Sequence, residues 1–196
     1  MSERATRGHG LLEPLLARLR ARKAESLIPG ALRRGRVLDI GCGSSPYFLS
    51  HTYFTEKHAV DQLPPASGSA DILWHQLDLN DRPRLSFEDG FFQVVTMLAV
   101  AEHLDPSALE QLFGECRRVL APGGRLVVTT PAARADRLLR FMARVGLVSR
   151  EEIDEHKYAY TPALLGWYFG RAGFEMAKVE VGHFELGYNL WATVDR

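Results

Sequence analysis

The chain is poor in cysteine, has no net charge and contains no long apolar run. Of its 196 residues only Cys42 and Cys116 are cysteines. Two cysteines are too few for a disulfide framework and their spacing matches no zinc motif, so we expect reduced thiols and no metal. No apolar run approaches the roughly 20 residues of a membrane span. Because Glu13, Pro14 and Arg18 interrupt the leucine-rich start, a signal peptide is disfavoured and a cytoplasmic protein is expected.

The zero net charge hides two unlike parts. Twenty-four Lys and Arg balance 24 Asp and Glu. However, residues 1–36 hold nine basic and three acidic side chains, whereas residues 37–196 hold fifteen basic and twenty-one acidic ones. A neutral total argues against general polyanion binding, because phosphate recognition usually needs a basic excess. Nucleic acid is therefore disfavoured as a partner, although the basic start keeps it as an alternative.

Length and composition indicate one globular domain over residues 1–196, since 46% of the residues are hydrophobic and 24% are charged. Residues 1–35 form a basic amphipathic helical extension of that domain. Leucines recur at helical spacing over residues 10–27 among four basic side chains, and Pro29-Gly30 ends the pattern. We favour a lid over the functional site for this helix, because its leucine-rich amphipathicity already accounts for the segment. The alternative is contact with a phosphorylated or nucleic-acid substrate.

Short apolar runs alternate with helical patterns along the rest of the chain. Strands are predicted at 36–40, 58–61, within 71–78, at 92–98 and at 125–130, and helices behind Asp105-Pro106, over 134–147 and from Thr161 to Gly173. This alternation predicts a doubly wound, mostly parallel α/β sheet. Two further strands, 174–181 and 184–194, are separated only by Gly182-His183, so they should pair antiparallel at one edge. The expected fold is a Rossmann-like sheet of seven strands.

The strongest motif follows the first predicted strand. Asp39-Ile-Gly41-Cys-Gly43 brings backbone close to a ligand, and Asp61 ends the second strand, where an acid accepts hydrogen bonds from ribose hydroxyls. Pro46 stands where a dinucleotide fingerprint has its third glycine. Asp39 would repel a pyrophosphate but could accept from an ammonium group. These residues favour a cofactor with an adenosine end and a zwitterionic amino-acid end over NAD or ATP.

With these motifs the chain resembles the class I S-adenosylmethionine (SAM) dependent methyltransferases, especially the small-domain type 11 group. The likeness covers residues 36–181 in the family's order. Besides the glycine motif and Asp61, it rests on six stretches: Leu77-Asp78-Leu79, residues 87–95, residues 101–104, residues 117–126, residues 156–160 and residues 171–174.

Three positions depart from the family pattern. Ser45 replaces a frequent third glycine, and Gln93 replaces the aspartate that usually precedes the valines of the fourth strand. Neither should affect the cofactor site, because serine is small and Gln93 should lie at the other end of its strand. No Asn/Asp-Pro-Pro-Tyr/Phe motif follows that strand, which counts against methylation of an adenine or glutamine amino group.

The resemblance implies the cofactor SAM, the product S-adenosylhomocysteine and no metal. It implies that Asp61 holds the ribose, that Asp78 contacts the adenine amino group and that the backbone of Leu79 contacts the ring. The complete set expected to bind the cofactor is Asp39, Gly41, Gly43, Asp61, Gln62, Asp78, Leu79 and Leu98.

The reaction implied by the resemblance is an in-line displacement at the sulfonium methyl group, for which positioning matters most and a general base helps a protonated nucleophile. His103, just past the fourth strand, is the candidate base; the alternative is a histidine that packs or hydrogen-bonds beside the cofactor. His156, Tyr158 and Tyr160 are candidates for the acceptor pocket. Their alternative is a solvated loop with one tyrosine tucked beneath it.

The predicted function is methyl transfer from SAM to a small molecule or biosynthetic intermediate by a monomer or homodimer. The alternatives are an RNA or protein methyltransferase and a non-catalytic SAM-binding module. A NAD-dependent oxidoreductase is disfavoured by Pro46.

Overall fold

The computed structural model describes all residues except 1–11, 66–69, 82 and 150–157. Its helices are α1 (Glu13–Leu27), α2 (Tyr47–His51), α3 (Pro106–Val119), α4 (Asp136–Arg144) and α6 (Pro162–Arg171). Its strands are β1 (Arg36–Ile40), β2 (Glu56–Asp61), β3 (Ile72–Gln76), β4 (Phe92–Leu98), β5 (Leu120–Pro131), β6 (Val179–Phe184) and β7 (Asn189–Asp195).

The seven strands form one sheet in the order β3-β2-β1-β4-β5-β7-β6. The pairs from β3 to β5 are parallel, while β7 pairs antiparallel with both β5 and β6. The predicted fold class is thereby confirmed, including the antiparallel edge. Strand order reverses direction between β1 and β4, which is the position where open α/β sheets bind ligands.

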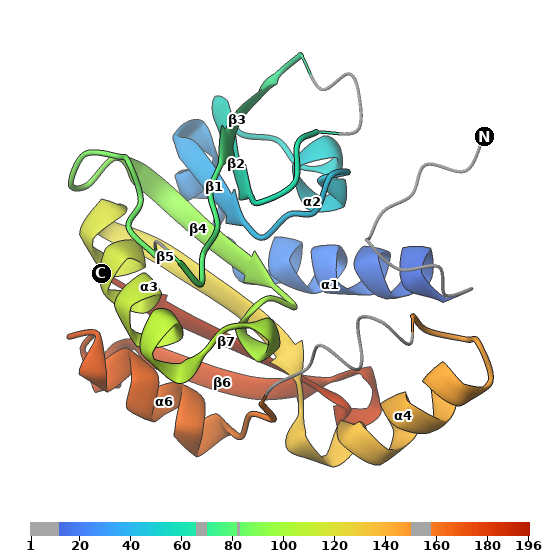
Figure 1. Cartoon of the computed structure of the whole chain (residues 1–196). Coiled ribbons are helices and arrows are strands. Elements are labelled where there is room, and N and C mark those ends of the chain that lie inside the picture. Colours follow the sequence, from blue (N-terminus) through green and yellow to red (C-terminus); the bar gives the residue numbers. More distant parts are fainter. Residues whose placement is uncertain (1–11, 66–69, 82, 150–157) are drawn as a thin grey trace.

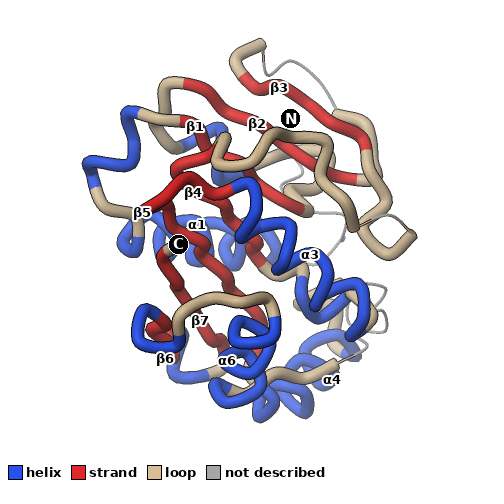
Figure 2. The backbone as a smooth tube through the Cα atoms, turned by 90° about the vertical axis from the view of Figure 1, so that its left-hand side faces the viewer, coloured by secondary structure: helices blue, strands red, loops and turns tan. Residues whose placement is uncertain are grey.

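Helices cover both faces of the sheet (Figures 1 and 2). On one face, α3 and α6 bury Leu109, Phe113 and Phe169 against the strands in the larger core cluster. On the other face, α1 and α2 enclose the smaller cluster, to which α1 contributes Ala21 and Ala24. Helix α1 is therefore packed against the sheet.

The C-terminal turn was predicted in the wrong place. Gly182-His183 lies inside β6, and the turn falls at residues 185–188 between β6 and β7. Gly182 pairs with Trp191 across the strands, and a Cβ atom there would come within 2.6 Å of the Trp191 ring. This glycine makes room for an indole ring.

Other predicted boundaries differ by a few residues. Strand β5 begins at Leu120, five residues before the predicted start, and includes the Pro122-Gly123-Gly124 turn residues. The helix predicted over 134–147 is a 3₁₀ turn, Ala133–Ala135, followed by α4, which ends at Arg144. Asp105 precedes α3 as predicted, but its side chain makes no capping hydrogen bond, whereas Thr161 accepts one from the Leu164 N–H at 3.2 Å.

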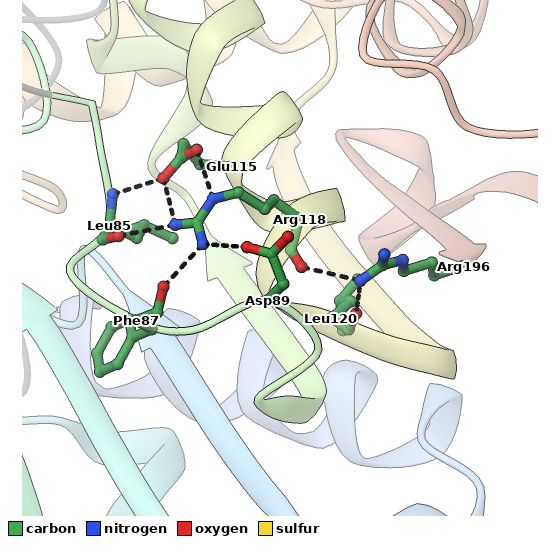
Figure 3. Close-up of polar contacts among 7 residues, drawn as sticks. All are labelled: Leu85, Phe87, Asp89, Glu115, Arg118, Leu120 and Arg196. Carbon is green, nitrogen blue, oxygen red and sulfur yellow. Dashed lines mark hydrogen bonds and ion pairs between the residues drawn. The ribbon is translucent and has the colours of Figure 1, made fainter.

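Arg118 on α3 fixes the loop between β3 and β4 (Figure 3). Its guanidinium donates to the carbonyl oxygens of Leu85 and Phe87, 2.8 and 2.7 Å away, and pairs with Asp89 and Glu115. The same Glu115 accepts from the Leu85 N–H at 2.9 Å. One guanidinium therefore satisfies several backbone groups of a loop that has little secondary structure of its own.

Candidate active site

The glycine turn after β1 lets its backbone come close to neighbouring groups. Gly41 and Gly43 have φ values of 70° and 67°, which favour glycine. A Cβ atom on Gly41 would lie 2.5 Å from a methyl group of Val100, so this backbone packs directly against the segment after β4. The Gly43 N–H donates to Asp61 Oδ2 at 2.8 Å. A hydrogen bond therefore links the glycine turn after β1 to Asp61 at the end of β2, and both were predicted to bind the cofactor.

Asp61 and Asp39 are both buried beside this turn. Asp61 ends β2 and also accepts from the Leu63 N–H at 2.9 Å. Asp39 accepts a 2.6 Å hydrogen bond from the Thr96 hydroxyl on the neighbouring strand. Burial raises the pKa of Asp39 to about 7; the hydrogen bond from Thr96 opposes this rise and the nearby Asp61 adds to it. A cationic group beside Asp39 would stabilise its charged form.

A cavity of about 540 Å³ opens above the carboxyl ends of β1, β2 and β4. The predicted residues that line it are Asp39, Gly41, Asp61, Gln62, Asp78, Leu79, Leu98 and His103. Gly43 does not itself form its wall, but it holds Asp61 in place. The structure thus gathers residues from four separate loops into one concave site, as expected for a ligand pocket.

His103 reaches the cavity on a short 3₁₀ turn, Ala101–His103. Ala99, just before this turn, has a φ of 60°, a conformation that is uncommon for residues other than glycine. The neighbouring Glu102 is 1% exposed and accepts from the Thr130 hydroxyl at 3.0 Å. Its other oxygen, Oε1, is buried and has no hydrogen-bond partner among the described residues. A polar group of a bound ligand could satisfy it.

The proposed pocket residues of the 156–160 stretch occupy different places. His156 lies outside the described residues. Tyr158 is 41% exposed, and neither it nor Tyr160 belongs to the described lining of the cavity. Tyr160 is 1% exposed and donates to the Ala101 carbonyl at 3.0 Å, and its burial raises its pKa. Tyr160 is thus the tucked tyrosine of the alternative interpretation: it supports the turn that carries His103.

Three segments that the sequence analysis did not assign to the site complete the wall. They are α1, which contributes Leu16, Ala17 and residues 19–21, α4, which contributes Leu139 and Met142, and the segment between β6 and β7, which contributes Glu185, Leu186, Tyr188 and Asn189. The role of α1 as a lid stays a prediction. The sequence analysis predicted that residues 185–189 belong to a strand over 184–194, although Gly187 interrupts the apolar alternation there.

The site fits an adenosine-bearing cofactor. The glycine backbone leaves room for close contact, and buried carboxylates face a cavity of sufficient volume. Glu102 Oε1 adds a hydrogen-bond acceptor that no described residue uses. In the described part of the chain no group of three or more His, Cys, Asp or Glu side chains could hold a metal ion. No helix among the described residues is long and apolar enough to cross a membrane.

A family model described as a methyltransferase domain, Methyltransf_23, matches residues 7–179. The chain belongs to this family, and its fold is that of the class I SAM-dependent methyltransferases. The matched range includes all of α1. No curated protein matches the chain.

Solved structures agree on the fold. A SAM-dependent methyltransferase from Archaeoglobus fulgidus superposes with a TM-score of 0.67 at 16% identity, over 91% of this chain and 94% of that one. One from Mesorhizobium loti gives a TM-score of 0.63 at 18% identity, covering 96% and 99% of the two chains. The PH0226 protein from Pyrococcus horikoshii gives 0.62 at 19% identity, covering 91% and 90%.

Proposed function

We propose that this protein transfers the methyl group of SAM to a small-molecule acceptor and releases S-adenosylhomocysteine. The observation that carries the proposal is the composition of the cavity. The residues that the resemblance assigns to the cofactor, including Asp39 and Asp61, line it together with apolar side chains of α1 and α4. A concave cavity of about 540 Å³ with apolar side chains in its wall suits a small acceptor better than a polymer strand or a folded protein.

The cofactor's sulfonium supplies an activated methyl group when it is bound. Asp61 would accept from the ribose hydroxyls, and Asp78 with the Leu79 N–H would hold the adenine, flanked by Gln62 and Leu98. Gly41 and Gly43 would allow the backbone to approach, and Asp39 would face the ammonium end. The remaining work of this chain is to place acceptor and methyl group in line and to exclude water.

Calorimetry with SAM and with S-adenosylhomocysteine tests this assignment. Asp61→Ala should weaken the binding of both by about 1–3 kcal/mol, because charge-assisted hydrogen bonds to the ribose are lost. Asp71→Ala is the control, since Asp71 is exposed and pairs with Lys57 on the outer strands. Absence of binding by either ligand would falsify the proposal, and an unaffected Asp61→Ala variant would mean that the ribose is held elsewhere.

The acceptor class is tested by label transfer. The protein, given methyl-labelled SAM and a cell extract, should label the low-mass fraction. Label that appears instead in RNA or in protein would support the alternative acceptors. Binding of SAM with no transfer to any fraction would favour a non-catalytic binding module.

We further propose that His103 is the general base for a protonated nucleophile. His103→Ala should lower the rate of label transfer by about 10²-fold or more, while the affinity for S-adenosylhomocysteine stays within about threefold, because a base acts on the acceptor's proton. His183→Ala, at an exposed position on β6, is the control. Equal activity of His103→Ala and the wild type would remove this role.

A further inference from the structure

The end of the cavity away from the glycine turn is apolar. Leu16 and Leu19 of α1 line it together with Leu139 and Met142 of α4. The residue before α1 is joined to the segment after α4, because the Leu12 N–H donates to the Leu147 carbonyl at 2.9 Å. If the proposed function holds, the cofactor occupies the other end, so this apolar chamber is the space left for the acceptor.

One acidic side chain from the C-terminal part of the chain also lines the cavity. Glu185, from the turn between β6 and β7, lines the cavity, and its Oε2 accepts from the Asn189 side chain. Its Oε1 is buried and has no hydrogen-bond partner among the described residues. Burial raises the pKa of Glu185, while the charge of Arg20 across the cavity opposes the rise. A buried carboxylate oxygen without a donor is costly, and a ligand can remove that cost.

The backbone that presents Glu185 is strained and held in place. Glu185 and Leu186 have φ values of 51° and 56°, an unfavourable conformation for side chains of this kind. Arg134 Nε donates to the Gly187 carbonyl at 2.5 Å, and the Ala132 N–H donates to that of Tyr188 at 2.8 Å. The start of the α4 segment thus fixes the turn, as is common where a side chain is positioned for binding.

The charge of the wall restricts the occupant further. Five acidic side chains line the cavity: Asp39, Asp61, Asp78, Glu102 and Glu185. Arg20 is the only Lys or Arg among the described lining residues. This excess of negative charge would repel an anionic acceptor. It would not repel a neutral or cationic molecule that donates a hydrogen bond.

We propose that the acceptor is an apolar molecule that carries an O–H or N–H donor, and that Glu185 Oε1 accepts the hydrogen bond from it. This inference rests on the proposed function. It makes Glu185 a specificity-determining residue and leaves proton removal to a different group.

The test uses the full chain saturated with S-adenosylhomocysteine and four probes with the same body: 4-butylphenol, 4-butylbenzylamine, 4-butylanisole and 4-butylbenzoate. Equilibrium dialysis measures their dissociation constants. The phenol and the benzylamine should bind at least about tenfold tighter than the anisole and the benzoate, because only they satisfy the carboxylate without adding negative charge. Preference for the phenol indicates a hydroxyl acceptor and preference for the benzylamine an amine acceptor.

Two variants locate the effect. Glu185→Leu should bind the phenol and the anisole equally, and Glu185→Gln, which keeps the size of the side chain, should lose mainly the preference for the benzylamine. Glu180→Leu, at an exposed position on β6, should behave as the wild type.

Failure of the inference is distinct from failure of the proposed function. If S-adenosylhomocysteine itself does not bind, the proposed function fails. If it binds but no probe does, or the anisole or benzoate binds as tightly as the phenol and the benzylamine, the acceptor class is overturned. Should Glu185→Leu not fold, Glu185→Gln decides: an unchanged preference for the benzylamine would exclude the role of Glu185.

Discussion

At the scale of single residues, Asp39 shows how a binding site conflicts with stability. It is 3% exposed; Thr96 beside it donates a hydrogen bond, and the nearby Asp61 carries a like charge. Its pKa of about 7, raised by burial from an ordinary 3.8, means that the folded chain holds a proton there that the unfolded chain has lost. Its contribution to stability is therefore present at low pH and is lost as the pH rises through about 7.

Asp39→Asn should relieve this cost. At pH 8 the ligand-free variant should be more stable than the wild type by about 1–3 kcal/mol, and by much less at pH 5, because the amide carries no charge to bury. The same change should weaken SAM binding. Urea unfolding at both pH values and calorimetry measure the two effects. Asp71→Asn, at an exposed position, is the control, and a variant with equal effects at pH 5 and pH 8 would contradict the account.

At the scale of elements, the long loop between β3 and β4 depends on a contact from outside itself. The loop supplies Asp78 and Leu79 to the cavity, and further along the chain Arg118 of α3 fixes it (Figure 3). A loop held at one end by a guanidinium can keep its binding residues in place without a helix or strand of its own.

Arg118→Met should lower the free energy of unfolding by about 2–3 kcal/mol, because the carbonyl oxygens of Leu85 and Phe87 and the carboxylate of Glu115 lose their donor. Urea denaturation measures the loss. Arg117→Met, at the exposed neighbouring position of the same helix, should cost less than about 0.5 kcal/mol. Equal effects of the two substitutions would show that the contacts of Arg118 contribute little.

At the scale of the whole molecule, local patterns predicted the sheet well, and they singled out residues that the structure brings together at one cavity. Strand Arg36–Ile40, the glycine turn and Asp61 are all encoded within short segments, so their arrangement follows from parallel strands ending at one edge. The apolar part of the cavity wall could not be predicted in the same way. It combines α1, α4 and the 185–189 turn, which lie far apart in the sequence, and Gly182 signalled a turn although it accommodates Trp191.

The pH dependence of the whole molecule combines groups of opposite sign. His75 on β3 stacks against His58 at 5.3 Å, and burial, aided by the charge of His58, lowers the pKa of His75. Its contribution to stability is complete above its ordinary pKa of about 6.5 and is lost as the pH falls below it, because the unfolded chain then binds the proton more readily. Asp39 acts in the opposite direction, since its contribution grows as the pH falls below about 7.

The two groups can be separated by the slope of stability against pH. Between pH 7.5 and pH 5.5, His75→Phe should gain stability relative to the wild type as the pH falls, because the variant has no imidazole at this position whose protonation favours the unfolded chain. Asp39→Asn should lose stability relative to the wild type over the same range. Urea unfolding at closely spaced pH values gives both slopes, and His51→Phe, at an exposed position on α2, is the control. Parallel curves for His75→Phe and the wild type would show that His75 does not take up a proton on unfolding in this range, and that the pH dependence arises elsewhere.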